Sequence, residues 1–197
     1  SPTEEILTPN DLRMLFEAEE HPIAYNGWEP SGLAHLGTGV ICAYKMKDFA
    51  DAGVRFKAFL ATWHAYLNNK LGGDLALIRK AADLFRHSWI ALGVPADKVE
   101  FIYSDELYDD LSYWAKTMAI AKNLTIARTT RTLEIAGRKE GEAHYVSDFL
   151  YTPMQVADVF HLDVKICQLG MDQRKANVVA REIGEKIGFW KPICVHH

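Results

Sequence analysis

Short apolar runs typical of buried strands alternate along this chain with segments that carry helical patterns. The strand-like runs lie near residues 23–26, 54–61, 99–103, 164–168 and 193–195. Each intervening segment is long enough for the crossover that joins parallel strands, which needs about a dozen residues or more. The alternation predicts an α/β fold with a doubly wound parallel sheet.

Helix start and stop signals lie before and after the first of these runs. Thr8 is a suitable N-cap for a helix over 9–20, and Gly53 is a suitable C-cap for a helix over 38–51. For residues 62–73 we expect a loop or a short irregular segment.

Further helical segments follow the second strand-like run. Asp74 and Gly93 mark the ends of a helix with one apolar stripe, and 173–187 predicts another helix. Residues 109–160 carry only helical patterns and interrupt the alternation. We therefore predict one domain over residues 1–197 with a helical insertion at about 109–145, between the two halves of the sheet.

Composition narrows the class of protein. The chain has three cysteines, Cys42, Cys167 and Cys194, far apart and with no Cys-x-x-Cys pair, so neither a zinc site nor a disulfide framework is expected. We expect a reducing compartment, the cytoplasm. No apolar run reaches the ~18 residues of a membrane span, so no membrane partner is expected. The net charge of −4 argues against a DNA-binding surface over the whole chain.

The turn after the first run is the first candidate site. Residues 25–38 lead from a strand into a helix and contain Gly32, His35 and Gly37. Glycines allow close backbone approach, and the start of a helix attracts anions, phosphate above all. The alternative is an ordinary glycine-containing turn with a surface histidine.

A second turn, at 170–175, also joins a strand to a helix. Asp172 in this turn is suited to hold the hydroxyl pair of a ribose, and the neighbouring Gln173 to hold a carboxylate or an amine. The alternative is that Asp172 simply caps the following helix.

Tyr151, Gln155 and Asp158 are spaced to share one face of a helix. The residues around them are apolar, which favours a pocket lining over a solvated face. Such a cluster can bind an α-amino group or accept the proton of a phenol. His64, His196 and His197 fit core packing, exposure or a chain end better than metal binding, so no protein metal site is expected.

Four segments, in order, resemble the motifs of one family. Residues 25–32 match Tyr-x-Gly-aromatic-Glu-Pro-Ser-Gly, and 61–68 resemble Ala-Asp-x-His-Ala-x-Leu-Asn. Residues 151–158 resemble Tyr-Pro-x-Met-Gln-x-x-Asp, and 170–175 resemble Gly-x-Asp/Glu-Gln-Arg-Lys. Together they resemble the catalytic domain of the tyrosyl-tRNA synthetases of archaea and eukaryotes, which are class I aminoacyl-tRNA synthetases. The resemblance implies their Rossmann-like fold and a nucleotide-binding catalytic domain.

It also implies roles for matching residues. Tyr25 and Asp158 would meet the phenolic hydroxyl of tyrosine. Its amino and carboxylate groups would be held by Tyr151, Gln155 and Gln173. ATP would be held by Gly27, Glu29, Ser31, Gly32, His35, Gly37 and, at the ribose, Asp172. Catalysis would depend on His35, Thr38 and Gln173.

The implied reaction has two steps. Tyrosine attacks the α-phosphorus of ATP to give tyrosyl-adenylate, and tRNA(Tyr) then takes the tyrosine. ATP is a substrate, with Mg²⁺ on its phosphates. The resemblance implies a homodimer through the helical insertion. A basic run there, Lys122, Arg128, Arg131, Arg138 and Lys139, fits either a solvated helix face or contact with the tRNA backbone.

Several departures from the family motif limit these expectations. Thr38 stands where the first signature, of His-x-Gly-His type, has its second histidine, so weaker charge stabilisation is expected. Thr62 and Trp63 stand in place of the acidic residue that the family has before the His-Ala segment, and we expect Trp63 to close or support a wall of the tyrosine pocket. We expect the Lys-Met-Ser-Lys-Ser loop and the anticodon-binding domain to lie outside this chain, since 45–47 falls within a helix. The piece alone is expected to be weak in adenylate formation.

Three alternatives remain. One is a tryptophanyl-tRNA synthetase, disfavoured by Tyr25 with Asp158. A second is a non-catalytic paralogue that binds tyrosine or a nucleotide, motivated by Thr38. A third is a nucleotidylyltransferase that makes another adenylate.

Overall fold

The computed structural model describes residues 3–133 and 145–197. In this part of the chain six strands form one sheet, in the order β1-β6-β5-β2-β3-β4. The five strands from β2 to β6 are parallel, and β1 pairs with β6 in the antiparallel sense. The strands are β1 (Glu5–Leu7), β2 (Ile23–Trp28), β3 (Arg55–Leu60), β4 (Val99–Tyr103), β5 (Ile166–Leu169) and β6 (Ile193–His196). The predicted α/β fold with a doubly wound parallel sheet is confirmed.

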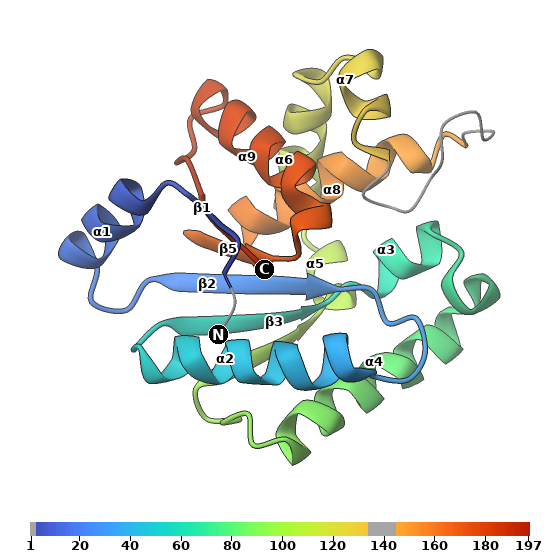
Figure 1. Cartoon of the computed structure of the whole chain (residues 1–197). Coiled ribbons are helices and arrows are strands. Elements are labelled where there is room, and N and C mark those ends of the chain that lie inside the picture. Colours follow the sequence, from blue (N-terminus) through green and yellow to red (C-terminus); the bar gives the residue numbers. More distant parts are fainter. Residues whose placement is uncertain (1–2, 134–144) are drawn as a thin grey trace.

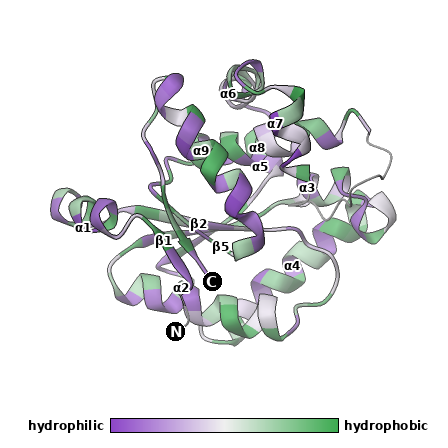
Figure 2. Ribbon diagram, turned by 45° about the horizontal axis from the view of Figure 1, so that its top comes forward, coloured by the Kyte–Doolittle hydropathy of each residue, from purple (hydrophilic) through white to green (hydrophobic). Residues whose placement is uncertain are grey.

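Helices cover both faces of the sheet (Figure 1). On one face lie α2 (Cys42–Asp51) and α4 (Leu75–Ala91), which share an apolar cluster with the strands that includes Met46, Phe56 and Trp89. On the other lie α8 (Asp148–His161) and α9 (Arg174–Lys186). Figure 2 shows hydrophobic and hydrophilic residues interspersed along α4 and α9, as in amphipathic helices that bury one side on a sheet.

The remaining helices are short or peripheral. They are α1 (Pro9–Ala18), the π-helical η1 (Leu36–Ile41), α3 (Thr62–Leu67), the 3₁₀ turn η2 (Lys70–Gly73), α5 (Asp105–Tyr108), α6 (Leu111–Lys122), α7 (Ile126–Thr130) and the 3₁₀ turn η4 (Met171–Gln173). None of the helices in the described ranges is long and apolar enough to cross a membrane.

Most predicted caps are confirmed. The Thr8 hydroxyl accepts a hydrogen bond from the Asp11 amide at 3.2 Å, and α1 begins at Pro9. The Asp74 carboxylate caps α4 by accepting from two amides. Gly53 and Gly93, with φ of 81° and 86°, follow α2 and α4 in the left-handed conformation that favours glycine.

Two segments differ from the prediction. The loop expected over 62–73 contains α3 and η2, because the Thr62 hydroxyl bonds to Ser104 and Asp105 and holds a helical turn that has no side-chain cap at Ala61. The edge strand β1 was not predicted. Only three residues long and half-buried, it carries no recognisable pattern and is held by its pairing with β6.

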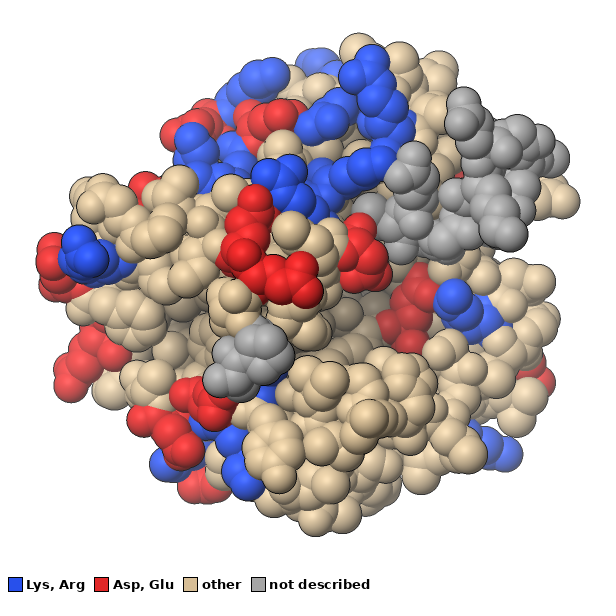
Figure 3. Space-filling view, viewed as in Figure 1, with Lys and Arg blue, Asp and Glu red and all other residues tan. Residues whose placement is uncertain are grey.

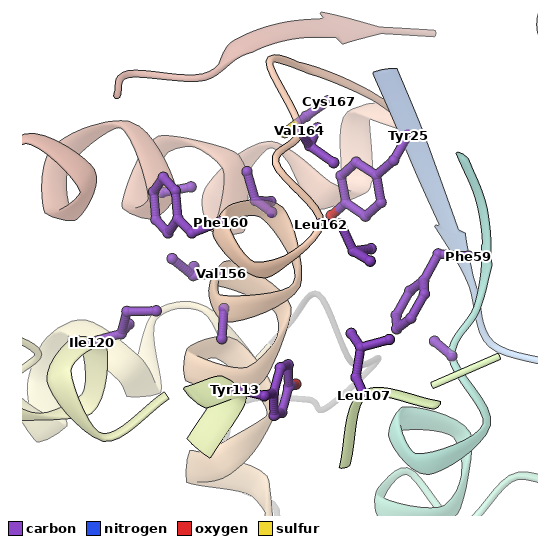
Figure 4. Close-up of a cluster of buried hydrophobic side chains, with 14 of the residues drawn as sticks. Tyr25, Phe59, Leu107, Tyr113, Ile120, Val156, Phe160, Leu162, Val164 and Cys167 are labelled. Atoms are coloured by element: carbon purple, nitrogen blue, oxygen red, sulfur yellow. The ribbon is translucent and has the colours of Figure 1, made fainter. Parts of the chain in front are cut away.

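The helical stretch after β4 divides into two parts. α8 packs on the sheet, and its Val156, Val159 and Phe160 join the core cluster (Figure 4). α6 packs on the outside of α8 through buried Tyr113, Thr117 and Ile120. α8 thus occupies the position of a crossover helix, and α6 with α7 forms an outer layer. The predicted insertion at 109–145 includes this layer, and the division stays a prediction.

Candidate functional site

A cavity of about 530 Å³ opens at the carboxyl ends of β2 and β5, where ligands bind in doubly wound sheets. η1, α3, α8 and η4 complete its walls. Its lining includes these predicted site residues: Tyr25, Gly27, Glu29, His35, Gly37, Thr38, Tyr151, Gln155, Asp158, Asp172 and Gln173. Ser31 and Gly32, both in the described part of the chain, do not line it.

Tyr25 and Asp158 lie deep in this cavity. Tyr25 projects from β2 beside Cys167 of β5, and Asp158 lies in the last turn of α8. Their exposed fractions are 1% and 2%. Burial raises the pKa of both groups well above the ordinary values, and the nearby Asp158 carboxylate adds to the shift at Tyr25. Two buried oxygens therefore line the inner end of the cavity, drawn from segments far apart in the sequence.

Two further side chains flank the Asp158 carboxylate. The Tyr113 hydroxyl donates to Asp158 Oδ1 at 2.9 Å. His64 Nε2 lies 3.6 Å from Asp158 Oδ2, and neither ring nitrogen of His64 has a hydrogen-bond partner. Burial lowers the pKa of His64 to about 4, so the ring is neutral at pH 7. The interpretation of His64 as a core residue holds, but this core residue also lines the cavity.

Glu29 contacts three other residues of the cavity wall. The Tyr151 hydroxyl of α8 donates a short hydrogen bond to Glu29 Oε1. Asn68 Nδ2 donates to both Glu29 oxygens at 3.2 and 3.0 Å, and Lys70 Nζ lies 3.4 Å from Oε2. Glu29, predicted at the nucleotide, therefore also fixes a residue predicted at the amino acid.

A chain of amides links α8 to the second predicted turn. Gln155 Nε2 donates to Gln173 Oε1 at 3.1 Å, and Gln173 Nε2 donates to Asp172 Oδ2 at 2.9 Å. Gln155 Oε1 is buried without a partner, so it can still accept a hydrogen bond from a ligand. Asp172 does not cap α9, whose N-cap is Gln173. A side chain at Gly170 would meet the Asp172 carboxylate and displace it from its present position.

The first predicted turn forms the outer end of the cavity. His35 caps η1: its Nδ1 accepts from the Gly37 amide at 3.2 Å, which leaves the ring proton on Nε2. The Thr38 hydroxyl accepts from the His35 amide at 3.1 Å. The Thr38 carbonyl accepts from Trp89 Nε1 at 2.8 Å, which ties the turn to α4. Thr38 therefore holds His35 in place.

Trp63 does not line the cavity, so of the two roles expected for it, closing a wall or supporting one, the support remains. Its Nε1 donates to Asp105 Oδ1 at 3.2 Å, and its ring packs 5.7 Å from Tyr108. Tyr108 in turn stacks on Tyr113 at 5.1 Å. Trp63 thus supports the site from outside, through a row of rings that ends at Asp158.

Sequence reasoning missed several residues that line the cavity or lie directly behind its wall. Asn26 donates to Gln168 Oε1 at 2.9 Å, and Gln168 Nε2 lies 2.6 Å from His197 Nδ1. Asn68 is the last residue of the segment 61–68, and the resemblance of that segment to a family motif could have identified it. No sequence signal marks Lys70 or Tyr113. In the described ranges, no group of three or more His, Cys, Asp or Glu side chains is arranged to hold a metal ion.

Comparison with known proteins gives one family and a consistent set of relatives. Residues 17–196 match the model of class I tRNA synthetases (W and Y). The chain is 45% identical over 195 residues to a tyrosine–tRNA ligase of Aeropyrum pernix, covering 98% of this chain and 53% of that protein. It is 43% identical to one of Thermococcus sibiricus, covering 100% and 56%. The chain thus spans about half the length of these relatives.

Solved structures give the same picture. The crystal structure of tyrosyl-tRNA synthetase from Pyrococcus horikoshii complexed with L-tyrosine matches with a TM-score of 0.91 and 41% identity, covering 100% of this chain and 57% of that one. The Leishmania major enzyme in complex with tyrosinol matches with a TM-score of 0.94 and 37% identity, covering 99% and 29%. A match to a Plasmodium falciparum tryptophanyl-tRNA synthetase, at a TM-score of 0.74 and 20% identity and covering 97% and 52%, shows likeness of fold.

Proposed function

This chain belongs to the class I tRNA synthetase family of the tryptophan and tyrosine enzymes, and on that premise we propose that it is the catalytic domain of an enzyme that activates tyrosine with ATP and transfers it to tRNA(Tyr). The relatives' names support the choice of tyrosine. The observation that carries the proposal is the buried pair of oxygens from Tyr25 and Asp158 at the inner end of the cavity.

The pair accounts for selectivity against phenylalanine. A para-hydroxyl group can satisfy both oxygens, whereas phenylalanine would leave both desolvated and unpaired. A site built in this way rejects the analogue that lacks the hydroxyl by about 10⁴–10⁵-fold. An indole has its N–H at a different position, so the same pair disfavours tryptophan.

The middle of the cavity fits the amino-acid head group. We assign the α-ammonium to the acceptors Gln155 Oε1, Gln173 and the Tyr151 hydroxyl, of which the first is buried without a partner. The carboxylate of tyrosine then points outward, toward the turn that begins η1. Positioning of this kind converts the attack on ATP into an effectively intramolecular step.

The outer end fits ATP. We propose that Gly27, Glu29, His35 and Gly37 contact the nucleotide and that Asp172 accepts from its ribose hydroxyls. Because Nδ1 of His35 accepts the Gly37 amide, Nε2 carries the proton and can donate to the α-phosphate as negative charge builds up. Ser31 and Gly32 do not line the cavity, so their contact with ATP stays a prediction. Mg²⁺ would be held by the phosphates of ATP, which it neutralises.

In the first step the tyrosine carboxylate oxygen attacks the α-phosphorus and pyrophosphate leaves. In the second, a ribose hydroxyl at the end of tRNA(Tyr) attacks the activated carbonyl and AMP leaves. Neither step needs a covalent intermediate on the enzyme. His35, Thr38 and Gln173 act by orientation and by donating hydrogen bonds where charge develops.

We propose that the outer layer of α6 and α7 forms a homodimer interface. Leu111 and Met118, seven residues apart on one side of α6, are 82% and 55% exposed, and Ile126 of α7 is 76% exposed. Large apolar side chains so exposed on two neighbouring helices favour a protein partner. Light scattering that finds a monomer at micromolar concentration counts against this interface.

Basic side chains gather on the same side of the molecule, in the upper part of Figure 3. Of the basic run, Lys122 and Arg131 are exposed, while Arg128 pairs with Glu182 at 2.8 Å. Arg138 and Lys139 lie outside the described residues. We propose that this side contacts the tRNA backbone. The three cysteines are free and buried, in keeping with a cytoplasmic location.

The test is ATP–pyrophosphate exchange driven by each of the twenty amino acids in the full-length protein. Exchange with tyrosine alone is the expected result. Tyrosine binding without exchange indicates the non-catalytic paralogue, and exchange that does not depend on tyrosine indicates another adenylate-forming enzyme. Exchange driven by tryptophan overturns the substrate assignment.

A further inference from the structure

A residue of the outer helical layer reaches the inner end of the cavity. Tyr113 of α6 is fully buried, and its hydroxyl donates to Asp158 Oδ1 at 2.9 Å. It does not line the cavity, so it cannot touch a bound amino acid directly. We infer that Tyr113 is a positioning residue that sets the selectivity for tyrosine by fixing the Asp158 carboxyl group. This inference rests on the proposed function.

The surroundings disfavour an ionised Asp158. It is 2% exposed and lies in the last turn of α8, where the helix dipole repels negative charge. Among the described residues, the Tyr113 hydroxyl is the group that donates a hydrogen bond to this carboxyl. A donor held on one oxygen stabilises the charged form and fixes the plane of the group.

One of the two carboxyl oxygens of Asp158 stays free to accept a hydrogen bond from a ligand. Tyr113 occupies Oδ1, whereas Oδ2 faces His64 Nε2 at 3.6 Å, which is too far for a hydrogen bond. A phenolic proton that enters the cavity therefore meets Oδ2. Without Tyr113, the carboxyl group could turn and present either oxygen at a poorer angle.

Tyr113 is itself held rigidly. Its ring stacks on Tyr108 at 5.1 Å and meets the edges of Trp114 and His161 at 5.3 and 5.4 Å. Its hydroxyl also lies 3.3 Å from a second acceptor, the Met154 carbonyl. The shorter contact with the more strongly accepting carboxylate takes the single proton. Figure 4 shows Tyr113 and Tyr25 on opposite sides of the same cluster.

Tyr113→Phe removes the hydroxyl and keeps every ring contact, so the fold is retained. The chain offers a matched control in Tyr108, which stacks on Tyr113 and whose buried hydroxyl makes no hydrogen bond to Asp158. Tyr108→Phe deletes the same atom from the adjacent ring without touching Asp158.

The experiment measures Kd for L-tyrosine, L-phenylalanine and ATP by calorimetry on the chain and its variants, with a melting curve for each. We expect Tyr113→Phe to reduce the tyrosine-to-phenylalanine preference about tenfold, through weaker tyrosine binding alone. Phenylalanine and ATP binding should stay within about twofold, as should all values for Tyr108→Phe. In an Asp158→Ala background, which removes the acceptor, Tyr113→Phe should no longer change the preference, because its effect passes through the Asp158 side chain.

An unchanged preference in a folded Tyr113→Phe protein overturns the inference and leaves the proposed function intact. An equal loss in Tyr108→Phe, or an equal loss for phenylalanine, also overturns it, because it indicates a packing effect. Absence of any tyrosine preference in the unsubstituted chain overturns the proposed function itself and the inference with it.

Discussion

Replacement of Asp158 by alanine tests whether one carboxyl group separates tyrosine from phenylalanine. The substitution removes one of the two oxygens proposed to meet the para-hydroxyl. It should not unfold the protein, because the freed Tyr113 hydroxyl retains the Met154 carbonyl as an acceptor at 3.3 Å. The variant also removes the cost of a carboxyl group that is 2% exposed.

The size of the effect follows from the chemistry of that group. A hydrogen bond to a charged partner contributes about 1.5–3 kcal/mol, and tenfold in affinity corresponds to about 1.4 kcal/mol. Asp158→Ala should therefore weaken tyrosine binding by about ten- to a hundredfold. Phenylalanine, which makes no such bond, should bind as before or somewhat better. Tyr25 remains, so part of the selectivity is retained.

The assay is calorimetric titration with tyrosine, phenylalanine and ATP at pH 8. Burial raises the pKa of Asp158, and a high pH gives the ionised form its largest population. Asp163→Asn is the matched control, since Asp163 follows the same helix but has a side chain that is 61% exposed and bound to Lys165. Asp172→Ala is the reciprocal variant, which should weaken ATP binding and leave the tyrosine preference unchanged.

Equal losses of tyrosine, phenylalanine and ATP binding in Asp158→Ala would refute the reasoning. They would mean that this face of α8 is structural and that the cavity recognises its guest elsewhere. A loss of ATP binding alone would reverse the assignment of the two ends.

Three further outcomes are expected. Burial lowers the pKa of His64 to about 4, so the unfolded chain takes up a proton first as the pH falls. The contribution of this histidine to the free energy of unfolding is therefore fully present above about pH 6.5 and falls by up to about 3 kcal/mol toward pH 4. Urea denaturation of His64→Gln should show a flatter dependence of stability on pH. Thr38→Ala removes the acceptor of the His35 amide, so it should slow tyrosine-dependent pyrophosphate exchange in the full-length protein about tenfold and leave tyrosine affinity unchanged. A slower rate together with weaker tyrosine binding would contradict an orienting role. Leu111→Glu combined with Ile126→Glu buries charges in the proposed interface and should convert a dimer to a monomer in light scattering. The control is Leu84→Glu on α4 combined with Leu92→Glu at the C-cap of that helix, where both leucines are exposed.

Local patterns determined most of the framework. Apolar runs located β2 to β6 to within a few residues, and Thr8, Asp74, Gly53 and Gly93 marked helix ends, because caps and periodicity depend only on neighbours along the chain. β1 and α3 were not predicted, because each is short and is held by partners far away in the sequence. The resemblance of four segments supplied the list of candidate site residues.

Only the tertiary structure decided which of those residues act together. Glu29 meets Tyr151 across 122 positions, and Tyr113 of the outer layer meets Asp158 across 45. The same geometry leaves Ser31 off the cavity lining and sends Trp63 to Asp105. A hydrogen bond depends on a few tenths of an ångström between atoms that the packing of helices on the sheet brings together. Sequence spacing carries no information at that scale, whereas it fixes which residues share a helix face or follow a strand.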